Sequence, residues 1–379
     1  MSGGSSGLVG RLENELRQLW ETAGDGGTPI ARVCTMNLEV VSPSFDVLQR
    51  YTPVVDEVTG SIPARAILAS IEPDSDVDEL TGTASAVPSA ENATKICSER
   101  VVLACRGNAA AGAASAIEAF LLPELPTTLV WLGRVHETDP IFEDLANDAN
   151  RIILDSEYTS IASVIQVASW ARKQPNAPQI ADLAWTRIAT WQEMLARFFD
   201  DVKNRELAGK VTKIRVVQAS ETGARLGPEA ALLLGWVGTR LGWKTARLAG
   251  AMRFKRPDGG TIAVELAAVP RPEGVAPHTL ASVMIEAGDD AHNPSLKGTI
   301  ERELASGLAE REGTTVDADV VVWKLQGPDG NAIEQSVRLR ANKAAKWLER
   351  TLHRPAVDIA FSESVAFAES IIQDGLTVS

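Results

Sequence analysis

The chain contains four histidines, whose side chains could bind a metal ion or act in catalysis, but their spacing matches no known metal-binding motif. The histidines are His136, His278, His292 and His353, and no two of them lie at ligand spacing on one predicted element. His136 is followed by Glu137, but the pattern does not continue to H-E-x-x-H, so no metal centre is predicted. A Ser-His-Asp triad stays open as an alternative, because its members need not be neighbours in sequence.

Phosphate-binding loops are not predicted either. Gly209 and Lys210 are followed by Val211 and lack the upstream glycine of a P-loop. Gly107 and Gly112 follow a predicted strand, but their spacing is not that of G-x-G-x-x-G, so a dinucleotide site has little support. Residues 3–7 read G-x-S-x-G, yet no strand precedes them, as a nucleophile elbow requires.

The three cysteines are Cys34, Cys97 and Cys105, an odd and low number that is typical of a reducing compartment. Cys97 and Cys105 lie on one predicted strand, about 26 Å apart at the usual rise, so they cannot bond to each other. Cys34 alternates with apolar residues and is expected to face a core. Buried, reduced thiols are predicted, and a redox switch is the alternative.

Composition narrows the class of protein further. The chain has 379 residues, 37 Lys+Arg against 50 Asp+Glu, and a net charge of -13, which argues against nucleic acid or an anionic membrane surface as a partner. It contains no apolar run of about 18 residues, so no transmembrane helix is expected. Its first residues lack the basic and apolar regions of a signal peptide. A cytoplasmic protein is expected.

We next consider the helices and strands that would position functional side chains. Residues 1–28 are predicted to form a flexible tail and an amphipathic helix. Residues 29–205 alternate strands and helices, which predicts an N-terminal α/β domain with a mostly parallel or mixed sheet. Residues 73–92 are acidic and poor in bulky apolar side chains, and they are predicted to form a mobile loop. The strands on either side of that loop, 64–71 and 95–105, are expected to pair as a hairpin. Further strands are predicted at 31–41, 127–132 and 151–154, and helices at 43–60, 109–122, 142–150, 161–171 and 182–199.

Residues 206–379 are predicted to form a C-terminal α+β domain with a mostly antiparallel sheet. A strand at 213–218 is followed by a very apolar helix at 228–241. Gly242 lies where a left-handed C-cap residue belongs, and Trp243 is expected to fold back on the last helical turn. The turn at 257–260 predicts a hairpin within 251–269. Strands are also predicted at 280–286, 314–325 and 334–339, and a final helical region from 343.

Five segments resemble one family. The segments are RVCTMNLEVV (32–41), LPTTLVWLG (125–133), FEDLANDANRIILDS (142–156), DLAWTRIATWQEMLARFFD (182–200) and LLLGWVGTRLGW (232–243). The chain resembles the OpcA family, the glucose-6-phosphate dehydrogenase assembly proteins, over roughly residues 30 to 355. Leu132 stands where the family usually has a second Trp. No cysteine follows Cys105, so the thioredoxin-linked control of cyanobacterial members is not expected here.

The resemblance implies a function without catalysis. It implies a protein that binds glucose-6-phosphate dehydrogenase, promotes its assembled and active form, supports the oxidative pentose phosphate pathway and has no cofactor of its own. The alternative is an enzyme or small-molecule sensor of unrecognised type.

The predicted partner surface lies at the carboxyl ends of the strands between 125 and 200, because the loops at that edge of a parallel sheet converge. Trp and Arg are also enriched among residues that dominate interfaces. The candidate contact residues are Trp131, Arg134, Asp155, Ser156, Asp182, Trp185 and Arg187. The alternative is structural: Asp182 caps a helix, Trp185 packs in a core and Asp155 only ends a strand.

Overall fold

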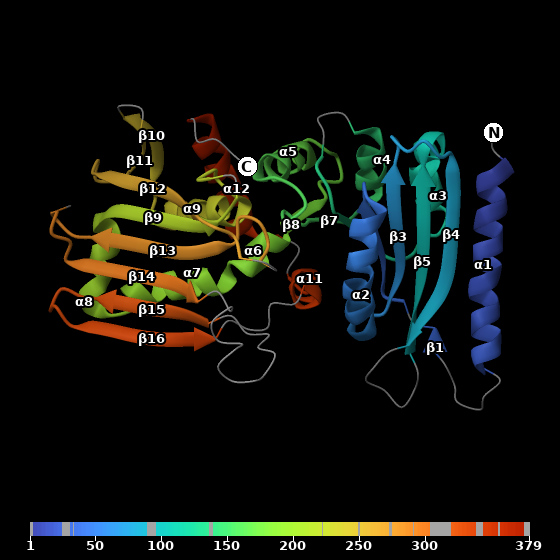
Figure 1. Ribbon diagram of the computed structural model, residues 1–379, viewed down its shortest axis with the longest axis horizontal. Coiled ribbons are helices and arrows are strands. Elements are labelled where there is room, and N and C mark those ends of the chain that lie inside the picture. The colour runs from blue at the N-terminus through green and yellow to red at the C-terminus, as the bar shows by residue number, and fades with distance from the viewer. Residues whose placement is uncertain are drawn as a thin grey trace. The chain divides into compact units, whose positions relative to one another are not determined.

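The protein is described from a computed structural model, with its elements shown in Figure 1. The residues that the structure describes are 3–24, 31–32, 34–88, 96–135, 139–221, 223–248, 251–272, 275–290, 292–303, 320–338, 344–354 and 357–374. Within these ranges, no helix has both the length and the apolar character needed to cross a membrane.

The chain forms two compact units that do not coincide with the predicted domains. Unit 1 comprises Met1–Thr159, Ser169–Leu183 and Ala344–Ala356, and unit 2 comprises Ser160–Ala168, Ala184–Lys343 and Val357–Ser379. Residues 184–205, placed in the N-terminal domain from the sequence, thus belong to unit 2. Residues 344–356, placed in the C-terminal domain, return to unit 1.

Unit 1 is built on an eight-stranded sheet with the order β1-β5-β3-β2-β6-β7-β8, and β4 pairs with β5 at one side. The pairings of its described strands are parallel except that of β4 with β5. Eight of the nine residues of β3 are buried, as expected for a strand covered on both faces. The predicted α/β class with a mostly parallel sheet is confirmed. The strands are β1 (Ala31–Arg32), β2 (Met36–Ser42), β3 (Ala64–Glu72), β4 (Glu79–Pro88), β5 (Ile96–Arg106), β6 (Thr127–Trp131), β7 (Arg151–Leu154) and β8 (Gln179–Asp182).

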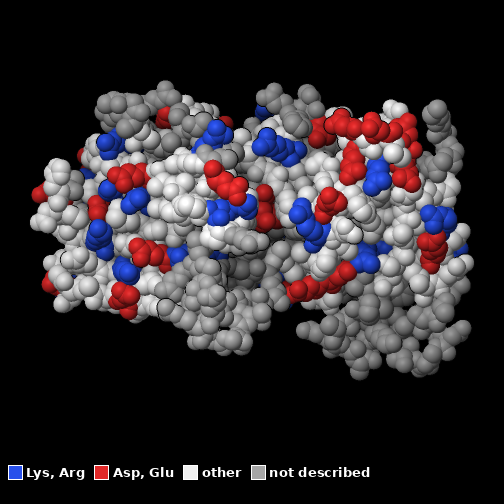
Figure 2. All heavy atoms as spheres, in the orientation of Figure 1, with Lys and Arg blue, Asp and Glu red and all other residues white. Residues whose placement is uncertain are grey.

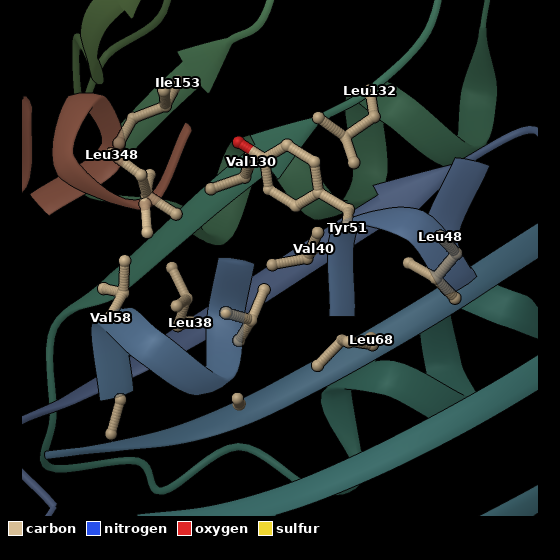
Figure 3. Close-up of a cluster of buried hydrophobic side chains, with 14 of the residues drawn as sticks. Leu38, Val40, Leu48, Tyr51, Val58, Leu68, Val130, Leu132, Ile153 and Leu348 are labelled. Atoms are coloured by element: carbon tan, nitrogen blue, oxygen red, sulfur yellow. The ribbon is translucent and has the colours of Figure 1, made fainter. Parts of the chain in front are cut away.

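A buried apolar cluster holds this sheet against helices on one face (Figure 3). Leu38 and Val40 of β2 pack there with Tyr51 of α2, and Leu348 of α11 joins them from the far end of the chain. The helices with residues in unit 1 are α1 (Gly3–Gly24), α2 (Phe45–Ser61), η1 (Gly107–Gly112), α3 (Ala113–Glu118), α4 (Pro140–Asp148), α5 (Ile161–Ala171, shared with unit 2) and α11 (Ala344–Leu352).

The C-terminal end of α11 is fixed by Arg151 at the start of β7. Its guanidinium donates hydrogen bonds to the carbonyl oxygens of Thr351, Leu352 and Arg354, at 3.1, 2.9 and 3.0 Å. Carbonyls at a helix C-terminus generally need partners from outside the helix, and a cation there also interacts favourably with the helix dipole. This contact ties residues about 200 positions apart in sequence, which explains why 344–356 belongs to unit 1.

The mobile loop predicted at 73–92 was wrong for half of its length, because β4 occupies Glu79–Pro88; residues 89–92 lie outside the described part. Ten residues of β4 pair with β5 in antiparallel register. Small side chains let α1 approach closely: a Cβ on Gly82 would lie 2.8 Å from Leu103 Cδ2 and 3.0 Å from Leu12 Cδ1. Backbone pairing and close packing therefore stabilise a segment with few bulky side chains.

Two further expectations for this region are corrected. The predicted hairpin of 64–71 with 95–105 does not form, because β3 and β5 run parallel and β4 lies between them in sequence. Of residues 1–28, predicted as a flexible tail and an amphipathic helix, all of the described ones belong to the helix α1, which begins at Gly3.

Unit 2 contains a second eight-stranded sheet, ordered β10-β11-β12-β9-β13-β14-β15-β16. Among its described strands, only β9 and β12 pair in parallel, so the predicted, mostly antiparallel sheet is confirmed. Strands β10 and β14 had not been predicted. The strands are β9 (Val211–Ala219), β10 (Lys244–Leu248), β11 (Ala251–Lys255), β12 (Thr261–Val269), β13 (Leu280–Ala287), β14 (Leu296–Glu303), β15 (Val320–Gln326) and β16 (Ala332–Arg338). The helices are α6 (Leu183–Arg187), α7 (Ala189–Ala196), η2 (Arg197–Phe199), α8 (Val202–Arg205), η3 (Glu206–Lys210), α9 (Pro228–Arg240) and α12 (Ile359–Gln373).

Helix α9 ends as its sequence predicts. Gly242 has a φ of +66°, and the Trp243 amide donates to the Gly238 carbonyl at 2.7 Å. Helix α12 packs very closely on α9, because a Cβ on Gly235 would overlap the carbonyl oxygen of Ser364. The small side chains of α9 thus set the distance between the two helices.

The two faces of the unit 2 sheet differ in chemistry. On the helix-covered face, Phe198 stacks on Trp323 with ring centroids 5.1 Å apart. Elsewhere the sheet carries cross-strand ion pairs such as Lys213–Glu265, at 2.8 Å. Figure 2 shows basic and acidic side chains interspersed over this unit. Exposed pairs of this kind contribute little stability.

Candidate functional site

A cavity of about 760 Å³ opens at the carboxyl ends of three strands of unit 1, β2, β3 and β6. Strand β2 pairs with β3 on one side and β6 on the other, so the chain reverses its direction of winding at β2. Ligands of open α/β sheets bind at such a point. Its apolar wall includes Val41, Val47, Ile71, Leu132 and Ile141. The cavity is therefore the candidate ligand site of unit 1.

The residues around this cavity do not fit a dinucleotide. Pro43 follows β2 where a glycine-rich turn would be needed, and it has no amide N–H to donate to a phosphate. Glu72 at the end of β3 accepts a hydrogen bond from the Phe45 amide, the first residue of α2, at 2.5 Å. A carboxylate of the chain thus occupies the helix end that would bind the pyrophosphate.

The loops after β2 and β6 also contact each other across this position. A Cβ on Gly133 would lie 2.6 Å from Cδ of Pro43. Arg106 forms an ion pair with the second oxygen of Glu72, with Nε 3.2 Å from Oε2. The site is consequently closed to a pyrophosphate by residues that hold one another in place.

Two predicted contact residues, Trp131 and Arg134, line this cavity. Trp131 is 4% exposed, and its ring meets the ring of Phe142 edge-on at 5.1 Å, so most of its surface is used inside unit 1. Arg134 is exposed. Of these two residues, Arg134 is therefore the one whose side chain faces solvent. The nearby histidine, His136, lies outside the described residues.

Three more predicted residues lie at the carboxyl ends of β7 and β8 and are buried: Asp155, Ser156 and Asp182. The amide and hydroxyl of Ser156 both donate to Asp182 Oδ1, at 3.2 and 2.9 Å. Asp182 is the last residue of β8, and the helix predicted at 182–199 is divided into α6, α7 and η2. Asp182 thus connects two strand ends, and the single helix predicted at 182–199 is corrected to these three shorter helices, the first of which begins directly after Asp182.

The last two predicted residues, Trp185 and Arg187, lie on α6 in unit 2. Trp185 is 5% exposed, and its Nε1 donates to Asp358 Oδ2 at 2.8 Å. Asp358 also accepts from the Phe361 amide and caps α12. Arg187 pairs with Glu229 of α9 at 3.0 Å. Both side chains therefore have contacts inside unit 2, and their role as partner contacts stays a prediction.

Sequence reasoning missed Glu39, in the middle of β2. Its side chain is 1% exposed, and Oε2 has no hydrogen-bond partner among the described residues. Burial, followed by the nearby charges of Glu118 and Asp148, raises its pKa to about 8. The signal was available, because Glu39, between Leu38 and Val40, is a charged residue in a strand whose other residues are uncharged.

The described thiols differ in their environment. Cys105 is buried, and desolvation raises the pKa of its thiol to about 11. Cys34 is partly exposed, against the expectation that it faces a core. The side chain of Cys97 lies outside the described residues. Among those described, no cluster of three or more His, Cys, Asp or Glu side chains could hold a metal ion.

Two family models match the chain, both describing a subunit of glucose-6-phosphate dehydrogenase. The model of that subunit's N-terminal domain matches residues 55–188, and the model of its C-terminal domain matches residues 178–365. The putative OxPP cycle protein OpcA of Synechocystis sp. is 26% identical over 356 residues, covering 88% of this chain and 70% of that protein. Its namesake from Synechococcus elongatus is 32% identical over 219 residues, covering 54% of this chain and 47% of that protein.

Solved structures give weaker similarities. UDP-N-acetylglucosamine 3-dehydrogenase from Acidithiobacillus ferrooxidans has a TM-score of 0.42 and 9% identity, with 90% of this chain and 97% of that chain covered. Levoglucosan dehydrogenase in complex with NADH and L-sorbose has a TM-score of 0.38 and 11% identity, with 91% of each chain covered. Scores this low support no functional argument. The two family matches together extend over residues 55–365, and the chain belongs to the OpcA family of glucose-6-phosphate dehydrogenase subunit and assembly proteins.

Proposed function

We propose that this protein is a non-enzymatic assembly factor that binds glucose-6-phosphate dehydrogenase in the cytoplasm and activates it for the oxidative pentose phosphate pathway. The observation that carries the proposal is the pair of family matches, both named for a subunit of that enzyme, over residues 55–365. The relatives named OxPP cycle protein OpcA support the same pathway.

The geometry of unit 1 supports a role without hydride transfer. In a doubly wound sheet, a nicotinamide cofactor would lie over the end of β2. Here Pro43 and the carboxylate of Glu72 occupy that position. A dehydrogenase reaction by this chain itself would need a different cofactor position.

The direct test uses both purified proteins. This chain is titrated into the dehydrogenase of the same organism, and NADPH formation is followed at limiting substrate. We expect the rate to rise and saturate with added chain, while the chain alone forms no NADPH. Complex formation is measured in parallel by light scattering after size exclusion. An unchanged rate together with the absence of a complex would rule out the proposed function.

Arg134 is the best-placed predicted contact, because it is exposed whereas Trp131, Asp155, Ser156, Asp182 and Trp185 are buried. We expect Arg134→Glu to weaken binding to the dehydrogenase by about 1–3 kcal/mol, the range of interface residues that matter. Arg172→Glu, at another exposed arginine of unit 1, is the matched control. Equal affinities of the two variants would remove Arg134 from the interface.

The alternative is an enzyme or small-molecule sensor, and the cavity at β2, β3 and β6 is the observation that favours sensing. Native mass spectrometry of the purified chain tests for a bound metabolite. A metabolite found without any effect on the dehydrogenase would favour this alternative.

A further inference from the structure

The cavity at the ends of β2, β3 and β6 has the size and the walls of a ligand site. The place where a phosphate would bind, at the start of α2, is occupied by the carboxylate of Glu72. Its volume of about 760 Å³ lies within the range of small-molecule sites, roughly 300–1,000 Å³. Buried apolar side chains from the ends of all three strands form its base: Val41, Ile71 and Leu132. A ligand with an apolar or aromatic body would remove this surface from water.

The carboxylate of Glu72 at the start of α2 restricts which ligands can bind in the cavity. Oxygen Oε1 of Glu72 accepts from the Phe45 amide, and Oε2 pairs with Arg106. Ser44, at the N-cap position, makes no capping bond with its side chain, so the carboxylate supplies the acceptor at this helix end. An incoming phosphate would have to displace a carboxylate that is held at both oxygens, and the two anions would repel each other.

The polar groups at the rim favour hydrogen-bond donors. Asp74, directly after β3, is exposed and lines the cavity with Ser75. Carboxylates in this position accept hydrogen bonds from the hydroxyl groups of a ribose. Asp139 also lines the cavity but accepts from the Phe142 amide as the cap of α4. Arg134 lines the cavity together with these two carboxylates and Glu72, so the lining is acidic on balance.

We propose that this cavity binds an unphosphorylated molecule with an aromatic or apolar body and hydroxyl groups, of the nucleoside class, and discriminates against its phosphorylated form. The apolar base contacts the ring, Asp74 accepts from the hydroxyls, and Glu72 excludes the phosphate. This site does not depend on the proposed partnership with the dehydrogenase, because its binding is measured on the chain alone.

The test compares two probes that differ by one phosphate, adenosine and adenosine 5′-monophosphate, by isothermal titration with the full-length chain. We expect adenosine to bind saturably at one site and the monophosphate to bind at least tenfold more weakly. Glu72→Gln keeps the shape and an acceptor oxygen but removes the charge, so the ratio of the two affinities should fall at least threefold.

Two matched variants place the binding in this cavity. Val47 and Val54 of α2 are both partly buried against the same core, but only Val47 lines the cavity. Val47→Trp should therefore abolish adenosine binding, and Val54→Trp should retain it, with folding checked by circular dichroism. Asp74→Asn, at an exposed position, should weaken adenosine binding about tenfold even if Val47→Trp fails to fold.

Three results would overturn the proposal. The first is a wild-type chain without saturable binding of adenosine, and the second is a wild-type chain that binds the monophosphate as tightly as adenosine. The third is adenosine binding that persists unchanged in folded Val47→Trp and in Asp74→Asn. None of these results would bear on activation of the dehydrogenase, which is measured separately.

Discussion

Glu39→Gln tests whether the buried carboxyl of β2 makes the stability of unit 1 depend on pH. The pKa of Glu39 is raised from an ordinary value of 4.5 to about 8, first by burial and then by the charges of Glu118 and Asp148. The unfolded chain releases this proton near pH 4.5, whereas the folded chain holds it until about pH 8. The folded state is therefore favoured by this group at low pH, and that contribution is lost as the pH rises towards 8.

The size of the effect follows from the shift. One pKa unit corresponds to about 1.4 kcal/mol, so the whole shift corresponds to about 5 kcal/mol, of which about 3–4 kcal/mol is lost between about pH 5 and 8. A glutamine has the shape of the protonated Glu39 and cannot ionise. We expect the stability of Glu39→Gln relative to the wild type to increase by about 3–4 kcal/mol between about pH 5 and pH 8.

The assay is urea unfolding at about pH 5, 6.5 and 8, which spans the range over which linkage predicts the loss of stability, with hydrogen exchange of the β2 amides as a local measure. Glu124→Gln makes the same chemical change at an exposed site and serves as the control. Glu118→Gln should remove part of the pH dependence, because the charge of Glu118 contributes to the raised pKa of Glu39. Parallel pH profiles of wild type and Glu39→Gln would refute the reasoning, since they would mean that Glu39 ionises alike in the folded and unfolded chains.

Three further predictions concern packing and reactivity. Trp185→Phe keeps an aromatic ring but removes the indole N–H that donates to Asp358, so it should cost about 2 kcal/mol in unfolding free energy. Binding of the folded variant to the dehydrogenase, measured at low temperature, separates the two roles: normal binding means that Trp185 only packs inside unit 2, and weakened binding supports its predicted role as a partner contact. Gly235→Ala should destabilise unit 2 by about 1–3 kcal/mol, because its Cβ would meet the backbone of α12, and an unchanged melting temperature would contradict the close approach. Cys105 should resist alkylation in the native chain because its pKa is about 11 and it is buried, whereas Cys34 should react first; mass spectrometry of peptides after timed alkylation measures the order.

Elements whose signals lie within one segment could be predicted from the sequence. The alternation of strands and helices predicted a parallel sheet in unit 1. The structure has this sheet, with β3 on one side of β2 and β6 on the other. The end of α9 at Gly242 and the turn at Gly259, which has a φ of +88°, were predicted from residue type, because few residues other than glycine adopt a left-handed backbone. Glu39, the one charged residue of β2, was equally visible in the sequence.

Features that depend on partners far away in the sequence became visible only in the folded chain. Strand β4 has too few bulky side chains to be recognised, and it forms because β5 supplies its backbone partners and α1 covers it. The hydrogen bond from Ser156 to Asp182 joins two strand ends that are 26 residues apart, and nothing in the local sequence predicts it. The same holds for Glu72, whose bond to the amide of Phe45 closes the phosphate position. Composition and periodicity report how each residue relates to its own segment, whereas these contacts join segments that the fold alone brings together.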